Sequence, residues 1–464
     1  MKALLCLLAI AGFARPGLAA EPRPNLIVIL ADDLGRGDYS AFGTKDIRTP
    51  NIDRLCREGI TFENFYANSC VCSPTRAALL TGCYPDRVGV PGVIRHTPEN
   101  SWGFLAPGAT LLPAVLKTAG YHSAIVGKWH LGLASPNTPT ERGFDFFHGF
   151  LGDMMDDYWS HLRGGQNFMR RNREVINPQG HATELFTEWA CEYLQERQAA
   201  GGPFFLYLAY NAPHVPVQPP PEWLAKVQKR EPGLGEKRAK LVALIEHLDD
   251  GIGRVLSTLD RLGLAQNTLV IFTSDNGGWL ESGANNGPWR SGKAHMYEGG
   301  LRVAGVARWP ARIQAGSRTQ RISLSMDIFA TLCQAAGAKS PPGIDGASFL
   351  PTLLGQSQPE PSRDRYFVWR DGGVAYGAKT MEAFVRGEWK LLQDSPFAPR
   401  ELYNLRRDPY ETTDLADKEK KVFRELDAGL RQQIQRAGQV PWQGPAPVTR
   451  MIHDPDSARG VARH

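Results

Sequence analysis

The stretch Asn25-Leu-Ile-Val-Ile-Leu-Ala-Asp-Asp33 (NLIVILADD) places a continuous apolar run directly before two carboxylates. Such a run, without polar alternation, is typical of a strand buried on both faces of a largely parallel sheet. In open α/β sheets, ligands bind in the crevice beyond the carboxyl ends of the strands. The stretch therefore predicts a fold class and also the edge of the sheet at which a site is expected.

Three further apolar runs end in the same way, in polar residues suited to chemistry. They are residues 123–126 before Gly-Lys128-Trp-His130, residues 203–210 before Asn211-Ala-Pro-His214, and residues 268–273 before Ser-Asp275-Asn276-Gly-Gly278. Helical patterns lie between the runs, at residues 111–119, 183–198 and 239–262. This alternation predicts an α/β fold, with a large mixed, mostly parallel sheet sandwiched by helices. All four polar tails are expected at one rim of that sheet.

The two ends of the chain differ from its middle. Residues 1–20 combine Lys2, an apolar run from Ala3 to Phe13 and small residues near residue 20, which predicts a cleaved secretory signal peptide. Residues 21–350 carry the α/β pattern and are expected to form the catalytic domain.

After about residue 350 the pattern changes to shorter, β-rich runs. These runs cover residues 365–370, 383–393 and 401–405, and an amphipathic helix is predicted over residues 418–437. We expect residues 351–464 to form a small α+β subdomain with an antiparallel sheet and an irregular, proline-rich tail from Pro441.

The composition excludes several classes of protein. A net charge of +5 over 464 residues gives no indication of nucleic-acid binding, and 42% hydrophobic with 22% charged residues is ordinary for a globular chain. Beyond the signal no run is long enough to span a membrane, so we expect an exported protein, periplasmic or secreted. The cysteines outside the signal are too sparse for a disulfide scaffold, and the sequence leaves open a Cys70–Cys83 or a Cys56–Cys70 bridge.

Four oxygen-bearing residues at two of the strand ends indicate a metal site. Asp32, Asp33, Asp275 and Asn276 offer neither sulfur nor imidazole, and such a set suits a hard cation, Ca²⁺ or Mg²⁺. Each pair alone is also typical of a turn. Because both pairs are expected at one rim, the metal interpretation is favoured.

Several cationic side chains are expected near the same rim. Arg76, Lys128 and Lys293, taken with a divalent metal, would outweigh the three aspartates, which is costly in a desolvated pocket unless an anion compensates. His130 and His214 follow two of the strands and are placed to act as acid or base. Taken singly, each of these residues could equally be a solvated surface side chain.

The stretch CVCSPTRAALLTG, residues 70–82, begins a predicted helix with Cys72 and places Arg76 in its first turn. Helices prefer cations at the opposite end, so this combination indicates a bound anion. As a zinc ligand, Cys72 lacks the paired spacing of structural zinc sites. As a plain thiolate nucleophile, it would be exposed to oxidation in an exported protein.

These residues resemble the signatures of the formylglycine-dependent sulfatases, within the alkaline phosphatase-like superfamily. Cys72-Ser-Pro-Thr-Arg76 with Leu80-Thr-Gly82 is similar to the family's Cys-x-Pro-x-Arg signature, and the stretch from Gly120 to His130 to its second signature. The similarity covers nearly the whole mature chain in the family's order, through Asp32-Asp33, Asn211-Ala-Pro-His214, Ser274-Asp-Asn-Gly277, Lys293, Glu298-Gly-Gly-Leu-Arg302, Ile344-Asp-Gly-Ala-Ser348 and Leu402-Tyr-Asn-Leu-Arg-Arg-Asp-Pro-Tyr-Glu411. With Asn285-Asn-Gly-Pro-Trp289 before Lys293, it resembles the arylsulfatase and N-acetylgalactosamine-6-sulfatase type.

The resemblance implies a cofactor, a partner and a set of roles. A separate maturation enzyme would oxidise Cys72 to formylglycine (3-oxoalanine), whose hydrate would attack the sulfur of a sulfate ester. The implied metal is Ca²⁺, with Mg²⁺ as the alternative, held by residue 72 with Asp32, Asp33, Asp275 and Asn276.

The implied catalytic roles fall on the basic residues. Arg76 would hold the hydrate, and Lys128 and Lys293 would neutralise sulfate oxygens. His214 would protonate the leaving oxygen, and His130 would remove the second proton of the hydrate.

The expected substrate is a sulfated small molecule or saccharide, such as an N-acetylgalactosamine sulfate of a glycosaminoglycan. Residues 95–102 and 150–172 are predicted to face it, the latter with Asp153, Asp156, Asp157, His161 and Arg163. Two alternatives stay open: a phosphate or phosphonate ester hydrolase of the same fold, and a non-catalytic sulfoglycan-binding protein.

Overall fold

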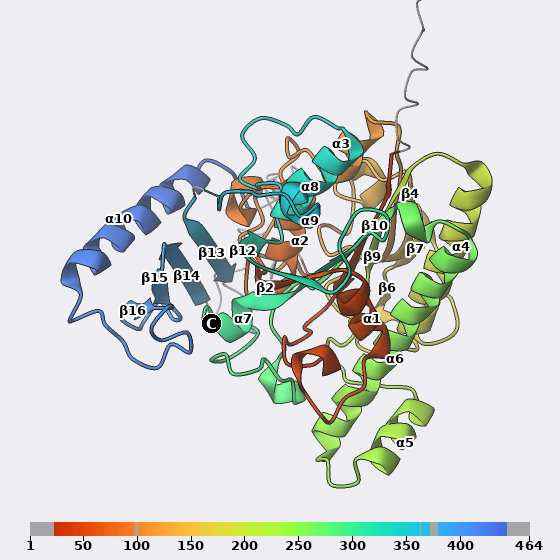
Figure 1. Ribbon diagram of the computed structural model, residues 1–464, viewed down its shortest axis with the longest axis horizontal. Helices are drawn as coiled ribbons and strands as arrows, with labels where there is room; N and C mark the ends of the chain where they lie inside the picture. Colours follow the sequence, from red (N-terminus) through yellow and green to blue (C-terminus); the bar gives the residue numbers. More distant parts are fainter. Residues whose placement is uncertain (1–22, 98–100, 362, 372–378, 443–464) are drawn as a thin grey trace, which may run out of the picture.

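A computed structural model describes residues 23–97, 101–361, 363–371 and 379–442 (Figure 1). The predicted signal peptide and most of the predicted irregular tail lie outside the described residues. The main element is a ten-stranded sheet. Its order is β12 (Ser317–Leu324), β2 (Ile60–Tyr66), β11 (Arg302–Arg308), β10 (Thr268–Ser274), β1 (Asn25–Ala31), β9 (Phe204–Ala209), β3 (His122–Lys128), β4 (Phe146–Phe150), β7 (Met169–Arg171) and β8 (Glu174–Val175).

The four strands with polar tails lie side by side at the centre of this sheet. Strand β1 pairs in parallel with β9 and with β10, and β9 pairs in parallel with β3. The register sets Ala31 opposite Ser274, while Leu30 and Gly127 both lie opposite Ala209. The strands therefore end together, and the predicted common rim is confirmed. The sheet is mixed because β11 runs antiparallel to both β10 and β2.

Helices cover both faces of the sheet, as predicted (Figure 1). One face carries α1 (Pro50–Glu58), α4 (Ala182–Ala200), α5 (Pro221–Arg230) and α6 (Glu236–Arg261). The other carries α2 (Cys72–Thr81), α3 (Leu112–Lys117), α8 (Asp327–Ala336) and α9 (Leu350–Leu353). Short 3-10 turns occupy Ser40–Phe42, Pro85–Val88, Pro139–Arg142, Ala265–Asn267 and Leu280–Ser282.

The C-terminal part forms a second, antiparallel sheet, drawn in blue in Figure 1. Its order is β13 (Arg365–Asp371), β14 (Lys379–Arg386), β15 (Trp389–Gln393) and β16 (Glu401–Asn404), and α10 (Lys420–Ala437) packs on β14 and β15. The run at residues 383–393 is thus two strands, because the chain turns at Gly387, whose φ of 58° suits glycine. The domain boundary near residue 350 stays a prediction.

A second apolar core joins the small sheet to the large one. Tyr66, Val71 and Met296 from the large sheet and its loops pack there with Phe367 and Leu402 of the small sheet. The start of α2 and the segment before α7 (Glu298–Leu301) are therefore held between the two sheets. A two-residue ladder, β5 (Leu162–Arg163) with β6 (Gln166–Asn167), stands apart.

The described residues also bear on membrane-spanning helices and on disulfides. None of the helices within the described residues has the length and apolar character that crossing a bilayer requires. In the described chain, neither the Cys70–Cys83 nor the Cys56–Cys70 disulfide is formed.

Candidate active site

The first residue of α2 lies at the centre of the rim. Cys72 follows Val71, whose extended backbone starts the helix, and every residue of α2 is buried. Because none of its residues is exposed, α2 lies inside the protein, with Val71 and Cys72 at its start lining a cavity. Gly82 ends the helix with a φ of 70°. The predicted helix that begins at Cys72 is confirmed, and it runs to Thr81.

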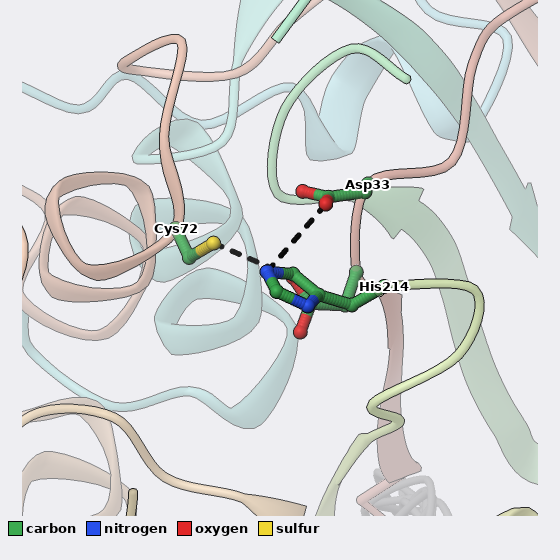
Figure 2. A group of neighbouring side chains, drawn as sticks. Asp33, Cys72 and His214 are labelled. Atoms are coloured by element: carbon green, nitrogen blue, oxygen red, sulfur yellow. Dashed lines mark hydrogen bonds and ion pairs between the residues drawn. The ribbon is translucent and has the colours of Figure 1, made fainter. Parts of the chain in front are cut away.

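The carboxylates that follow β1 and β10 converge beside Cys72. The backbone N–H of Asp33 donates to Asp275 Oδ1 (3.2 Å), and Asn276 Nδ2 donates to Asp33 Oδ1 (2.8 Å). One ligand atom from each of Asp32, Asp33, Cys72 and His214 lies within 4.8 Å of the others, and Figure 2 shows the last three side chains pointing toward one another.

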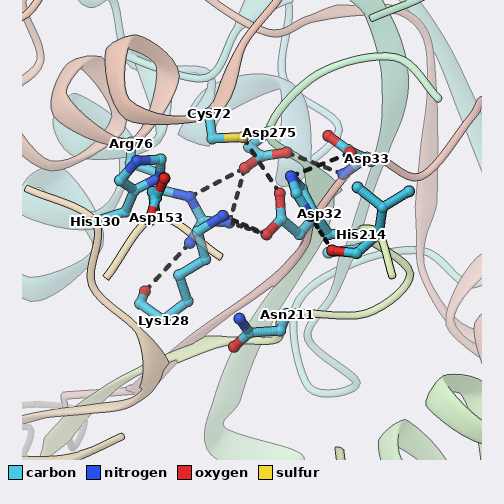
Figure 3. A network of polar contacts seen from close by, with 12 residues as sticks. Asp32, Asp33, Cys72, Arg76, Lys128, His130, Asp153, Asn211, His214 and Asp275 are labelled. Carbon is cyan, nitrogen blue, oxygen red and sulfur yellow. Dashed lines mark hydrogen bonds and ion pairs between the residues drawn. The ribbon is translucent and has the colours of Figure 1, made fainter. Parts of the chain in front are cut away.

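Each buried carboxylate is matched by a different cation, and Figure 3 shows Lys128 beside Asp32 and Arg76 beside Asp275. The shortest contacts are Lys128 Nζ to Asp32 Oδ2 at 2.5 Å, Arg76 to Asp275 Oδ2 at 2.7 Å, and Lys293 Nζ to Asp33 Oδ2 at 2.7 Å. The charges of these six side chains therefore nearly cancel. A divalent cation would leave the pocket positive, which suits an anionic substrate.

The environment separates the pKa values of two neighbouring aspartates. Burial opposes ionisation of Asp32, but the charges of Lys128 and Arg76 outweigh it and hold the pKa of Asp32 well below its usual value. Burial, with the negative charge of Asp32 next in importance, raises the pKa of Asp275 to about 7. Two carboxylates held this close indicate a place where additional positive charge is favourable.

The residues present fit a hard cation. The donor set consists of oxygen atoms, as Ca²⁺ and Mg²⁺ prefer. Asn276 Oδ1 is buried and has no hydrogen-bond partner among the described residues, which is costly unless a ligand is bound there. Together with the raised pKa of Asp275, this supports Asp32, Asp33, Asp275 and Asn276 as the ligands.

His214 is oriented by its own loop. Its Nδ1 lies 2.7 Å from the carbonyl oxygen of Val215, so that nitrogen carries the hydrogen, and Nε2 accepts from Lys293 Nζ at 2.9 Å. Burial, followed by the charge of Lys293, lowers the pKa of His214. The hydroxyl of Tyr158 lies 2.8 Å and 2.9 Å from the carbonyl oxygens of Asn211 and His214. Tyr158 thus positions this loop, a role that no sequence signal revealed.

His130 follows Lys128 by two residues and lines the same cavity as Cys72. Its Nε2 lies 2.8 Å from the carbonyl oxygen of Ile94, while Nδ1 is buried without a partner among the described residues. Burial, then the charge of Lys128, holds the pKa of His130 well below its usual value. His130 and Asp33 adopt φ values of 58° and 66°, which non-glycine residues rarely do. Such backbone strain is concentrated at functional sites.

The thiol of Cys72 is unsuited to act as it stands. Burial raises its pKa well above the usual value for cysteine, although Lys128 and Lys293 oppose this. Its Sγ lies 3.4 Å from Asp32 Oδ1, an arrangement that further disfavours a thiolate. A protonated thiol is a weak nucleophile, so the interpretation as a simple cysteine nucleophile loses support.

A cavity of about 200 Å³ opens at Cys72. Its lining includes predicted residues, namely Arg95, Asp153 and Arg163 from the two predicted substrate-facing loops. Three predicted residues of the segment 150–172 are not in the lining: Asp156, Asp157 and His161. Asp156 accepts from Arg163, Asp157 accepts from the N–H groups of residues 159 and 160, and His161 bonds the Gly180 carbonyl. Met154, from the same predicted segment, also lines the cavity. The lining further contains residues that sequence reasoning missed: Val71, Val93, Val215 and Trp279.

The structure therefore brings together all the predicted catalytic and ligand residues of the rim. One contact differs from what the resemblance implied. The guanidinium of Arg76 bonds Asp275 and the carbonyl oxygen of Lys128 (3.2 Å), so its bonds in this structure go to the pocket wall.

Comparisons with known proteins agree with this geometry. The family model named Sulfatase matches residues 24–338, and one named N-sulphoglucosamine sulphohydrolase, C-terminal, matches residues 289–439. The chain is 36% identical over 383 residues to N-acetylgalactosamine-6-sulfatase of Mus musculus, covering 77% of this chain and 71% of that protein. It is 30% identical over 495 residues to N-acetylgalactosamine-6-O-sulfatase of Bacteroides thetaiotaomicron, covering 87% and 92%. The crystal structure of Ps i-CgsB in complex with k-i-k-neocarrahexaose is similar with a TM-score of 0.82 and 29% identity, over 91% of this chain and 95% of that one.

Proposed function

Because this chain belongs to the sulfatase family, it is a sulfuric ester hydrolase, and we propose that it releases sulfate from a sulfated saccharide at the Cys72 pocket. The observation that carries the proposal is the meeting of three cation–carboxylate pairs around one buried cysteine at the start of a helix. Of the interpretations that the sequence left open, sulfate ester hydrolysis is the one that family membership favours.

The nucleophile of the proposal is formylglycine formed from Cys72 by a maturation enzyme. The buried, protonated thiol supports this, because an unmodified Cys72 would attack poorly. When hydrated, formylglycine supplies an oxygen nucleophile for the sulfur atom. The N-terminal end of α2 favours negative charge at this position.

Charge stabilisation is assigned to the metal site and two lysines. A bound Ca²⁺, with Mg²⁺ as the alternative, would add positive charge at the sulfate oxygens. Lys128 and Lys293 each lie against a carboxylate, so their ammonium groups are held in place before the substrate arrives. Such preorganised charge is usually the largest contribution to catalysis of this kind.

Proton transfer is assigned to the two histidines. His214 Nε2 shares the proton of Lys293 Nζ across 2.9 Å, so this pair can protonate the leaving alcohol oxygen. His130 Nδ1 is buried, unpartnered among the described residues and unprotonated because of its lowered pKa, so it can accept a proton from residue 72 and allow sulfate to leave. Arg76 pairs with Asp275 at 2.7 Å and fixes the position of that carboxylate.

The saccharide part of the proposal rests on the relatives. Two of them act, by name, on N-acetylgalactosamine 6-sulfate, and a solved relative was crystallised with an oligosaccharide. We extend this to an N-acetylgalactosamine sulfate as the preferred substrate here. Export to the periplasm or the medium, after removal of residues 1–20, completes the proposal.

Two measurements test it. Peptide mass analysis of active protein should show residue 72 as an aldehyde or its hydrate, and Cys72→Ala should abolish turnover. Rates on matched sulfate and phosphate esters of 4-nitrophenol should favour sulfate. Full activity with an intact Cys72 thiol, or a preference for phosphate, would overturn the proposal.

A further inference from the structure

One part of the pocket wall carries charged groups that sulfate transfer does not use. Asp153, between β4 and β5, and Arg163, at the end of β5, both line the cavity. They form a two-pronged ion pair, with Arg163 Nε 3.0 Å from Asp153 Oδ1 and Nη2 3.1 Å from Oδ2. Such paired hydrogen bonds fix both groups in one plane. Figure 3 draws Asp153 with the residues of the reacting end.

This pair is built into the protein rather than resting on its surface. The Asp153 side chain is 8% exposed and that of Arg163 is 20% exposed. Asp156 also binds this turn, because it accepts from Arg163 Nη1 at 2.8 Å and from the backbone N–H of Gly164 at 2.5 Å. Gly164 has a φ of 55°, and a Cβ there would lie 2.9 Å from His96 Nε2, so the turn fits closely against its neighbour.

The pair keeps hydrogen-bonding capacity for a ligand. A carboxylate offers about four acceptor positions, and Arg163 occupies one on each oxygen of Asp153. A guanidinium has five N–H donors, and the contacts with Asp153 and Asp156 use three of them. Acceptor and donor thus stand side by side, which suits the hydroxyl groups of a sugar, since each hydroxyl both donates and accepts.

The charge of this wall differs from that of the reacting end. Asp153 and Asp156 together carry one more negative charge than Arg163 can balance. Two further cations of the lining are also matched, Arg95 by Asp371 at 2.6 Å and Lys293 by Asp33 at 2.7 Å. Among the described residues, the other basic neighbour of Asp153 is His96, whose Nδ1 lies 4.0 Å from Asp153 Oδ1 and is charged only if the ring is protonated. A second anionic group on the substrate would therefore meet a carboxylate whose one full cation is already shared with Asp156, and this is unfavourable in the pocket.

An apolar surface completes the wall. Trp279 and Met154 line the same cavity, and Lys293 Nζ lies 5.2 Å from the centre of the Trp279 ring. An indole face can pack against the C–H face of a sugar ring. The cavity, at about 200 Å³, is smaller than the roughly 300–1,000 Å³ typical of drug-sized ligands, so it concerns the one ring that carries the sulfate.

We propose that the Asp153–Arg163 pair is the sugar-recognition element of the pocket and selects an uncharged ring with free hydroxyl groups, a hexosamine or hexose sulfate, over a sulfated uronate. The inference rests on the proposed sulfatase function and deepens it. The pair acts by binding the ring and takes no part in the bonds that form or break.

The test compares kcat/KM on three probes: N-acetylgalactosamine 6-sulfate, iduronate 2-sulfate and 4-nitrophenyl sulfate, which has no hydroxyl groups. The wild-type protein should prefer the hexosamine sulfate over the uronate sulfate. Asp153→Ala should lower the ratio of hexosamine to nitrophenyl kcat/KM by about 10- to 100-fold, mainly through KM, because a charge-assisted hydrogen bond is lost. Asp153→Asn keeps the shape but removes the charge, and should raise the ratio of uronate to hexosamine by about tenfold.

Asp157→Asn is the matched control, because Asp157 lies on the same loop but outside the cavity lining. It should leave both ratios within about twofold of the wild type. Equal losses on hexosamine and nitrophenyl sulfates in both Asp153 variants would assign a merely structural role and overturn the inference, as would a wild-type preference for the uronate. No turnover of any sulfate ester by protein with matured residue 72 would instead overturn the proposed function.

Discussion

Lys390 offers a sharp test of how the C-terminal sheet supports the site. Its Nζ lies 3.0 Å from Glu298 Oε1 and 2.7 Å from Glu411 Oε1, and all three side chains are buried. The backbone N–H of Glu298 also donates to Glu411 Oε2 at 2.7 Å. Glu298 starts α7, five residues after Lys293, so this triad ties the segment that carries Lys293 to β15.

The structure gives the size of the effect expected for Lys390→Met. At these distances and an effective dielectric constant of about 20, each pair attracts by about 6 kcal/mol. The cost of burying the charges offsets most of this in the intact triad. Removal of the cation alone leaves two buried carboxylates facing each other, which typically costs about 3–5 kcal/mol. At roughly 2 °C for each kcal/mol, the midpoint of thermal unfolding should fall by about 6–10 °C at pH 8.

The pH dependence separates charge from packing. Burial raises the pKa of Glu411 from 4.5 to about 7, so its contribution to stability is present below pH 4.5 and is lost as the pH rises to about 7. Burial opposes ionisation of Glu298, but Lys390 and Arg302 outweigh it and lower its pKa to about 2, so its contribution is present above pH 4.5 and is lost toward pH 2. Without Lys390 both carboxyl groups can be protonated at pH 5 but not at pH 8. The difference between variant and wild type should therefore be clearly smaller at pH 5.

Differential scanning calorimetry at both pH values measures this. Adding Glu411→Gln to Lys390→Met should recover about half of the loss, and Lys421→Met, on the exposed face of α10, should stay within about 0.5 kcal/mol of the wild type. An equal loss at pH 5 and pH 8, or no recovery in the double variant, would refute the electrostatic argument and leave a packing effect.

Three further outcomes are expected. His214→Ala should lower kcat by about 10²-fold or more on alkyl sulfates but by less than tenfold on 4-nitrophenyl sulfate, whose leaving group needs no proton; equal losses would count against its role as an acid. Tyr158→Phe should lower the free energy of unfolding by about 1–3 kcal/mol, because two buried carbonyl groups lose their partner, and an unchanged denaturation midpoint would contradict this. EDTA should lower both activity and the thermal midpoint, and Ca²⁺ should restore them; resistance of both readouts to the chelator would exclude an exchangeable ion at Asp32 and Asp275.

The centre of the sheet was predictable because its strands are apolar throughout. Strands β1, β3, β9 and β10 fall within two residues of the predicted runs, and their parallel pairing then places the polar tails together. Strands β2, β11 and β12 gave no such signal. Strand β12 reads Ser-Arg-Thr-Gln-Arg-Ile-Ser-Leu and lies at an edge, where one side faces solvent, and register shifts interrupt β11 and β12.

The membership of the site was predictable, but its pairing was not. Asp32 and Lys128 could be predicted because their position at strand ends and the family resemblance can both be read from the sequence. Which cation binds which carboxylate depends on the register, which sets Ala31 opposite Ser274 and so brings Asp275 within reach of Arg76. The hydrogen bonds of Tyr158 to the Asn211 and His214 carbonyl groups depend on the path of the loop that carries Tyr158. No periodic pattern in the sequence predicts the path of such a loop.

The burial of Cys72 constrains the order of events in the proposed maturation. Cys72 is 4% exposed, it starts a helix with no exposed face, and Val71 before it packs into the core shared by the two sheets. A second enzyme could reach this side chain only if α2 and part of that core were open, and opening a buried core element costs much of the global stability. Oxidation of Cys72 must therefore precede closure of the C-terminal sheet over Val71.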